Sequence, residues 1–132
     1  MEILSKDGKK VLSREEFNKF LSNPDTPIYS ATNNKIFSAG YFGVGEGWNL
    51  LLYTLLNKLL SLGWDGKITQ CKEKFGSLRF SVSVNDRQIK HYIQEFERES
   101  MNICSVCGES GAFQKMVNNY VHTKCESCFS KN

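Results

Sequence analysis

The chain has 132 residues, of which 40% are hydrophobic and 12% aromatic, and its formal net charge at pH 7 is +3. This length corresponds to one domain, and this composition excludes general disorder, which goes with few aromatics and a high net charge. A net charge of +3 does not by itself indicate a nucleic-acid partner, so such a partner would need a local patch of charge.

The first elements expected along the chain are a hairpin turn and a capped helix. Asp7-Gly8 lies between two apolar pairs, which is typical of a tight turn between strands. Ser13 and Glu16 form a capping-box pattern, so a helix is predicted to begin after Ser13. It should end near Asn23, because a proline follows and disfavours a helical conformation before it.

A loose hairpin interrupted by Asn33-Asn34 is predicted over residues 28–42. The glycines that follow are interpreted as a flexible loop. They do not form a dinucleotide-binding fingerprint, because their order differs and Glu46 lies where a phosphate would sit. These glycines are Gly40, Gly43, Gly45 and Gly47.

A long helix, a strand and an amphipathic helix are predicted over the middle of the chain. Residues 48–62 read as a helix that is apolar around most of its circumference, and therefore as the central core helix. Over residues 77–84 polar and apolar residues alternate strictly, which predicts a strand with one buried face. Asn85 or Asp86 is expected to cap a helix that ends near Ser100.

No segment is predicted to enter or cross a membrane. Ile3 and Leu4 are followed at once by charged residues, which is not the pattern of a secretory signal. The longest apolar stretch, residues 50–62, is shorter than the about 20 apolar residues that a membrane span needs. Five cysteines, an odd number, fit a reducing compartment better than a disulfide framework, so we expect a cytoplasmic protein.

Four cysteines near the C-terminus have the spacing of a zinc site: Cys104-x2-Cys107, seventeen further residues, and Cys125-x2-Cys128. Two cysteines three apart on a tight turn can point both sulfurs at one ion, and two such pairs complete a tetrahedron. Four thiolates close the coordination sphere, so we predict one structural Zn²⁺, which would lower the net charge to about +1. His122 stands three residues before Cys125, so a site of three cysteines and His122 remains a second possibility.

This C-terminal pattern resembles a treble-clef or zinc-ribbon finger. Gly47-Trp48 at the head of a Leu-rich helix, then residues 72–80, which read KEKFGSLRF, and then the cysteines resemble a family of small, uncharacterised bacterial and bacteriophage proteins. The resemblance covers roughly residues 47–128 and implies that His122 is not a ligand. It implies no activity. It makes a host-directed role an expectation, such as antagonism of a bacterial defence protein or of its signalling nucleotide.

Three segments are expected from these elements. Residues 1–46 hold the first hairpin, the first helix and the glycine-rich loop, residues 47–102 an α+β core, and residues 103–132 the zinc finger. The predicted fold is α+β, with two helices packed on a small antiparallel sheet and the zinc finger as an appendage.

The charged residues 72–80 are the other feature that can carry function, and two hairpin registers fit them. If Phe75-Gly76 form a two-residue turn, Lys72 lies opposite Arg79 and shares one face with Lys74. Like charges directly opposite one another are unfavourable by about 0.2–1 kcal/mol unless an anion lies between them. This register therefore predicts an anion-binding face.

A three-residue loop would instead pair Glu73 with Arg79 in an ordinary cross-strand salt bridge, and the charged cluster would then be structural. A slip of one residue moves side chains to the opposite face, so the sequence leaves both registers open. The candidate ligand-binding residues are Lys72, Lys74, Arg79 and Glu73.

Catalysis has little support in the sequence. His91 and His122 are the only histidines, and neither has a recognisable nucleophile or carboxylate partner. Cys71, on a predicted strand, is interpreted as a small core residue. An enzyme would need a pocket around Glu73 and Arg79, which no pattern indicates. We therefore predict a non-enzymatic binding protein.

The predicted partner is a protein or a phosphate-bearing ligand, with sequestration of a signalling nucleotide as one form of the latter. Nucleic-acid binding by the finger is the less favoured alternative. Over residues 104–128 only Lys115 and Lys124 are strong cations, and Glu109 and Glu126 balance them.

Overall fold

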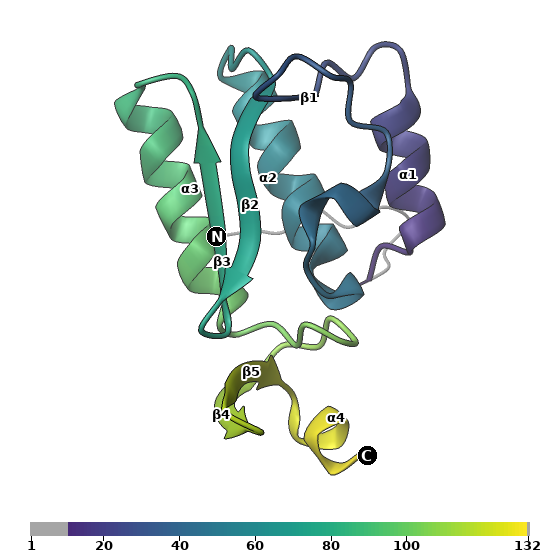
Figure 1. Cartoon of the computed structure of the whole chain (residues 1–132), viewed down its shortest axis with the longest axis vertical. Coiled ribbons are helices and arrows are strands. Elements are labelled where there is room, and N and C mark those ends of the chain that lie inside the picture. Colours follow the sequence, from purple (N-terminus) through teal and green to yellow (C-terminus); the bar gives the residue numbers. More distant parts are fainter. Residues whose placement is uncertain (1–10, 132) are drawn as a thin grey trace.

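The computed structural model of the chain describes residues 11–131, so the predicted turn at Asp7-Gly8 lies outside the described residues. These residues form an α+β fold, with a three-stranded sheet and its helices in one body and a two-stranded sheet near the C-terminus (Figure 1). The predicted fold class is confirmed.

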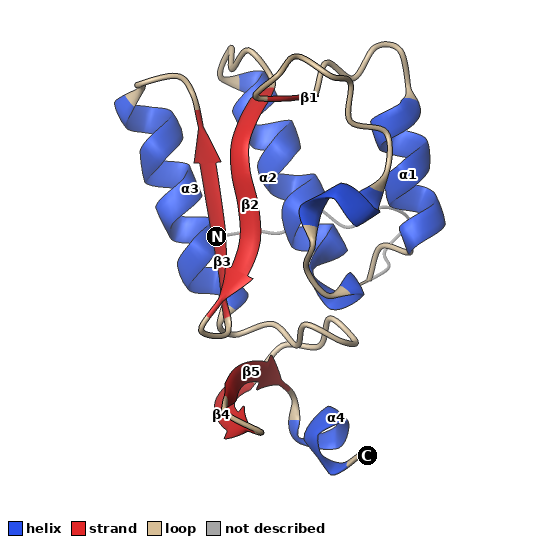
Figure 2. Cartoon of the chain, viewed as in Figure 1, coloured by secondary structure: helices blue, strands red, loops and turns tan. Residues whose placement is uncertain are grey.

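The elements are distinguished by type in Figure 2. In chain order they are α1 Arg14–Ser22, β1 Tyr29–Ser30, the 3-10 helices η2 Ala39–Phe42 and η3 Glu46–Trp48, α2 Asn49–Ser61, β2 Lys67–Lys74, β3 Ser77–Val82, α3 Arg87–Ser100, β4 Phe113–Val117, β5 Tyr120–Lys124 and α4 Glu126–Ser130.

Local bonds between side chains and backbone set the starts of α1 and α3. The Glu16 N–H donates to Ser13 Oγ at 3.1 Å, and the Ser13 N–H donates to Glu16 Oε1 at 3.3 Å, so the predicted capping box is confirmed. At α3 the Ile89 N–H donates to Asp86 Oδ1 at 3.0 Å. These bonds satisfy N–H groups that a helix leaves free in its first turn.

Helix α2 is the central core helix, as predicted. Its leucines Leu51, Leu52, Leu55, Leu56 and Leu59 are at most 1% exposed. Thr54 is also buried, and it donates its hydroxyl to the carbonyl oxygen of Leu50 at 2.8 Å. A buried hydroxyl is tolerated when it has such a partner. None of the helices described is both long enough and apolar enough to span a membrane.

The expected hairpin over residues 28–42 is only partly present. An isolated antiparallel bridge joins Tyr29 to Lys35 around Asn33, which has a positive φ of 66°. Strand β1 pairs in parallel with β2 through Tyr29 and Lys67, so the sheet is mixed and not wholly antiparallel. The chain after Ile36 turns into η2 and does not form a second strand.

The hairpin of β2 and β3 has the two-residue turn. Phe75 and Gly76 have φ angles of 54° and 79°, and a type I′ turn requires positive values at both positions. The strands pair Lys72 with Arg79 and Glu73 with Leu78. The first of the two predicted registers is therefore confirmed, and the alternative pairing of Glu73 with Arg79 is wrong.

The inner face of this hairpin belongs to the core. Ile68, Leu78 and Phe80 are at most 3% exposed and join the cluster built by α2 and α3. Helix α3 also occupies the free edge of β3, because the Leu78 N–H donates to Ser100 Oγ and the Phe80 N–H to Glu97 Oε2, both at 2.9 Å. This edge is thereby protected from pairing with another strand.

Candidate metal centre

Four cysteine side chains meet in the C-terminal module, residues 103–131. Cys104 and Cys107 lie in the turn that follows α3, while Cys125 and Cys128 lie at the start of α4. Their sulfurs are all within 4.8 Å of one another, and those of Cys107 and Cys125 are 3.6 Å apart. Four sulfurs bound tetrahedrally at 2.3 Å from zinc lie about 3.8 Å from one another. The cluster can therefore hold one metal ion.

The local backbone favours one thiolate in this cluster. Burial opposes ionisation of Cys104, but backbone N–H groups, that of Cys107 first, donate to its sulfur and lower its pKa to about 6. Burial, and the neighbouring sulfurs of Cys104 and Cys125, raise the pKa of Cys128 to about 12. Four thiolates at these distances repel one another, so a divalent cation is what allows all four to be ionised together.

His122 does not belong to the cluster. It lies on β5 opposite Lys115 of β4, and within the described part of the chain no histidine or carboxylate joins the four sulfurs. The donor set is thus four thiols, which is typical of zinc or of iron in a sulfur environment. The alternative of three cysteines and His122 is not supported.

The glycine-rich loop packs against the segment that carries the first cysteine pair. The Gly47 N–H donates to the carbonyl oxygen of Ser105 at 2.9 Å, and Trp48 Nε1 donates to that of Ile103 at 2.8 Å. A Cβ atom at Gly47 would overlap the carbonyl oxygen of Cys104, so only glycine allows this approach. The loop therefore packs against the C-terminal module.

The tip of the β2–β3 hairpin is the second part of the body that contacts the C-terminal module, and Figure 1 shows it pointing at β5. The hydroxyl of Thr123 is buried and donates to the carbonyl oxygen of Gly76. A Cβ atom at Gly76 would lie 2.8 Å from that hydroxyl oxygen. The Ser105 N–H donates to the carbonyl oxygen of Thr123 at 3.0 Å, and this bond links the residue that contacts Gly47 to the residue that contacts Gly76. Neither contact was expected from the sequence, although Gly47 and Gly76 were visible signals.

Three of the four predicted ligand-binding residues share the outer face of the β2–β3 hairpin. Lys72 and Arg79 lie opposite each other and are exposed, and Lys74 lies over the Phe75 ring at 5.6 Å from its centroid. Among the described residues no carboxylate oxygen lies within 4.0 Å of these cations. Glu73 is on the inner face opposite Leu78, so the structure does not bring it together with the other three.

The side chains considered for catalysis do not form a site. His91 Nε2 lies 3.0 Å from Glu95 Oε1 one helical turn away, so the expectation that His91 lacks a carboxylate partner is wrong. Cys71 packs against the core, as predicted. Burial, and the nearby charge of Glu97, raise the pKa of Cys71 to about 12, and such a thiol is a poor nucleophile.

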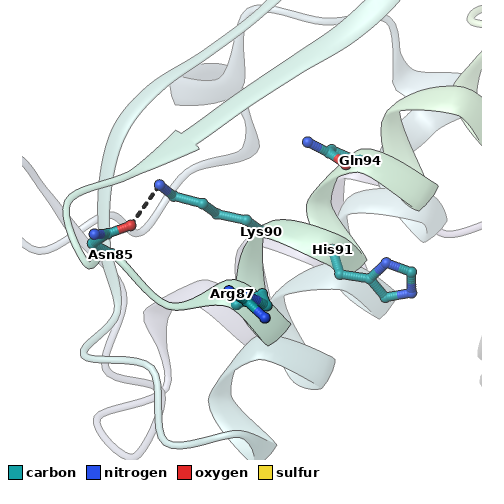
Figure 3. A pocket seen from close by; sticks show the side chains of 5 residues that line it. All are labelled: Asn85, Arg87, Lys90, His91 and Gln94. Atoms are coloured by element: carbon teal, nitrogen blue, oxygen red, sulfur yellow. Dashed lines mark hydrogen bonds between the residues drawn. The ribbon is translucent and has the colours of Figure 1, made fainter.

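An open depression of about 620 Å³ lies at the start of α3 and is shown in Figure 3. Its lining includes Arg87, Lys90 and His91, and Lys90 Nζ donates to Asn85 Oδ1 at 2.6 Å. Figure 3 shows the Lys90 and His91 side chains pointing away from each other. These groups do not converge on one point, as a catalytic site requires.

Comparison with protein-family models, with curated proteins and with solved structures found no match. The family resemblance and the host-directed role that it implies therefore stay predictions.

Proposed function

We propose that the protein is a zinc-stabilised, non-enzymatic binding protein that holds a phosphate-bearing partner on the outer face of its β2–β3 hairpin. Zn²⁺ bound by the four cysteines would have no open coordination position, which is typical of a structural ion. Its role would be to hold the Cys104 turn against Gly47 and the strand carrying Thr123 against Gly76.

The pairing of Lys72 with Arg79 is the observation that carries the binding proposal. Two cations directly opposite one another, without a carboxylate within 4.0 Å among the described residues, destabilise the hairpin. An anion between them would reverse this effect. The guanidinium of Arg79 can hold two phosphate oxygens at once, and the ammonium of Lys72 adds a second charge-assisted bond.

The test is a titration of the zinc-loaded chain with inorganic pyrophosphate, followed by amide chemical shifts in NMR. We expect the largest shifts at Lys72 and Arg79, and their loss in the Lys72→Gln/Arg79→Gln variant. The fold should be unchanged, because exposed charges contribute little to stability. The matched control is Lys19→Gln/Arg98→Gln, which removes the same charge from exposed positions on α1 and α3 and should leave binding intact. Equal binding by parent and first variant would refute the proposal.

A further inference from the structure

The β4–β5 hairpin of the C-terminal module has one face against the body and one away from it. Gln114 Nε2 donates to the carbonyl oxygen of Met101 at 2.7 Å, and Thr123 contacts Gly76, so their shared face is turned inward. Residues opposite in an antiparallel pair share a face, and neighbours along a strand alternate. The pair formed by Phe113 and Lys124 is therefore on the outward face.

This outward surface, which we name the β4–β5 aromatic face, combines aromatic rings with lysines. The residues on it that carry the argument are Phe113, Lys115, Tyr120, Lys124 and, from α4, Phe129; Val117 and His122 share the same face. The rings of Phe113 and Phe129 are 4.9 Å apart between centroids. The Nζ atoms of Lys115 and Lys124 lie 5.7 Å and 5.8 Å from the centroid of the Phe129 ring, so two cations from two strands accompany one aromatic ring.

The fold does not account for the exposure of the Phe113 and Tyr120 rings. Phe113 is 43% exposed and Tyr120 is 71% exposed, and every residue of β4 is exposed. Large apolar groups gathered on a surface mark an interaction site more often than single ones do. The two lysines are also available, because neither has a carboxylate oxygen within 4.0 Å among residues 11–131.

We propose that the β4–β5 aromatic face binds single-stranded nucleic acid. Exposed rings stack on unpaired bases of any sequence, while nearby cations meet the phosphates. Lysines are depleted from the cores of protein interfaces, so their place over the Phe129 ring argues against a protein partner. A duplex is disfavoured because its bases are not open to stacking and two cations neutralise too few phosphates.

The acidic residues that balance these lysines in the sequence do not cancel them in space. Glu109 and Glu126 form no ion pair of 4.0 Å or less with Lys115 or Lys124 within the described residues. The local surface is thus more favourable for a nucleic acid than the summed charge of the finger. This site is separate from the Lys72 and Arg79 pair, so the two proposals can fail independently.

The experiment measures the affinity of the zinc-loaded full chain for a short fluorescein-labelled oligothymidine by fluorescence anisotropy over a range of salt concentrations. Two cations on a single strand predict a slope of log K against log salt of about −1.4. Lys115→Gln/Lys124→Gln should bring this slope close to zero. Tyr120→Ala should weaken binding on the order of ten-fold, since it removes one stacking contact. Lys19→Gln/Arg98→Gln, with the same change of charge at exposed positions outside both proposed sites, should leave affinity and slope unchanged.

Several outcomes would overturn the proposal. These are no binding at low salt, equal loss in the Lys19→Gln/Arg98→Gln variant, or equal binding of a polyglutamate chain, which has charge but no bases. Self-association that depends on Tyr120 would identify a second copy as the occupant instead. If Tyr120→Ala loses its metal and does not fold, the salt slope of the lysine variant still decides.

Discussion

Gly47 and Gly76 show how a missing side chain lets two parts of the chain come together. Gly47 has an ordinary backbone conformation, so its constraint is space alone, because the Cys104 carbonyl occupies the position of a Cβ atom. Gly76 combines close approach to Thr123 with a φ of 79°, which side-chain-bearing residues rarely adopt. Each position therefore controls whether the C-terminal module can pack closely against the body.

Replacing Gly47 with alanine is expected to destabilise the protein by about 1–3 kcal/mol, as overpacking of a tight contact typically does. Chemical denaturation measures this, and the rate of zinc loss to a chelator should rise as well. Gly40→Ala is the control, since its Cβ atom would lie 3.5 Å from Ser38 Oγ, an ordinary contact. If both variants are as stable as the parent, the contact between Gly47 and Cys104 is not a structural constraint.

At the scale of elements, α2 and the β2–β3 hairpin form the core to which the other parts attach. Leu55 of α2 is 0% exposed and Phe80 of β3 is 3% exposed, as the strict alternation of the strand predicts. The positive φ angles of Phe75 and Gly76 set the register that turns Phe80 inward and Arg79 outward. One turn thus creates both the apolar face and the cationic face.

Truncation of either core residue should therefore be costly. We expect Leu55→Ala to destabilise by about 2–5 kcal/mol and Phe80→Ala by about 3–5 kcal/mol. Phe37→Ala is the matched control, because Phe37 is 63% exposed and its loss should change stability by no more than about 0.5 kcal/mol. Urea unfolding measures all three, and a similar effect of the two phenylalanine changes would place Phe80 outside the core.

At the scale of the whole molecule, the metal site lies in the module that contacts the body at two places, Gly47 and Gly76. The body has its own buried cluster, whereas every residue of β4 is exposed and only Thr123 of β5 is buried. The C-terminal module therefore has little apolar core, and a small module of this kind depends on its metal.

Metal removal should accordingly unfold the C-terminal module before the body. We expect one Zn²⁺ per chain by elemental analysis. Chelation, or Cys104→Ser or Cys125→Ser, should remove hydrogen-exchange protection over residues 104–131, while α2 stays protected. The absence of zinc from purified protein, or exchange unaffected by a chelator, would contradict this prediction.

The sequence by itself determined the features that depend on residues close together in the chain. The capping box at Ser13, the alternation around Phe80 and the paired cysteines needed only neighbours within a few positions. For that reason α1, α2, β3, α3 and the four ligands of the candidate metal site could be predicted.

Only the tertiary structure decided how distant residues meet. The contact of Gly47 with Ser105 and that of Gly76 with Thr123 join residues 58 and 47 positions apart, and no periodic pattern encodes such a meeting. The hairpin register was open because one slip exchanges the two faces, until the backbone at Phe75 and Gly76 resolved it. The β4–β5 aromatic face likewise could not be predicted from the summed charge of the finger, because the distance between a lysine and a carboxylate, not composition, decides whether the lysine is neutralised.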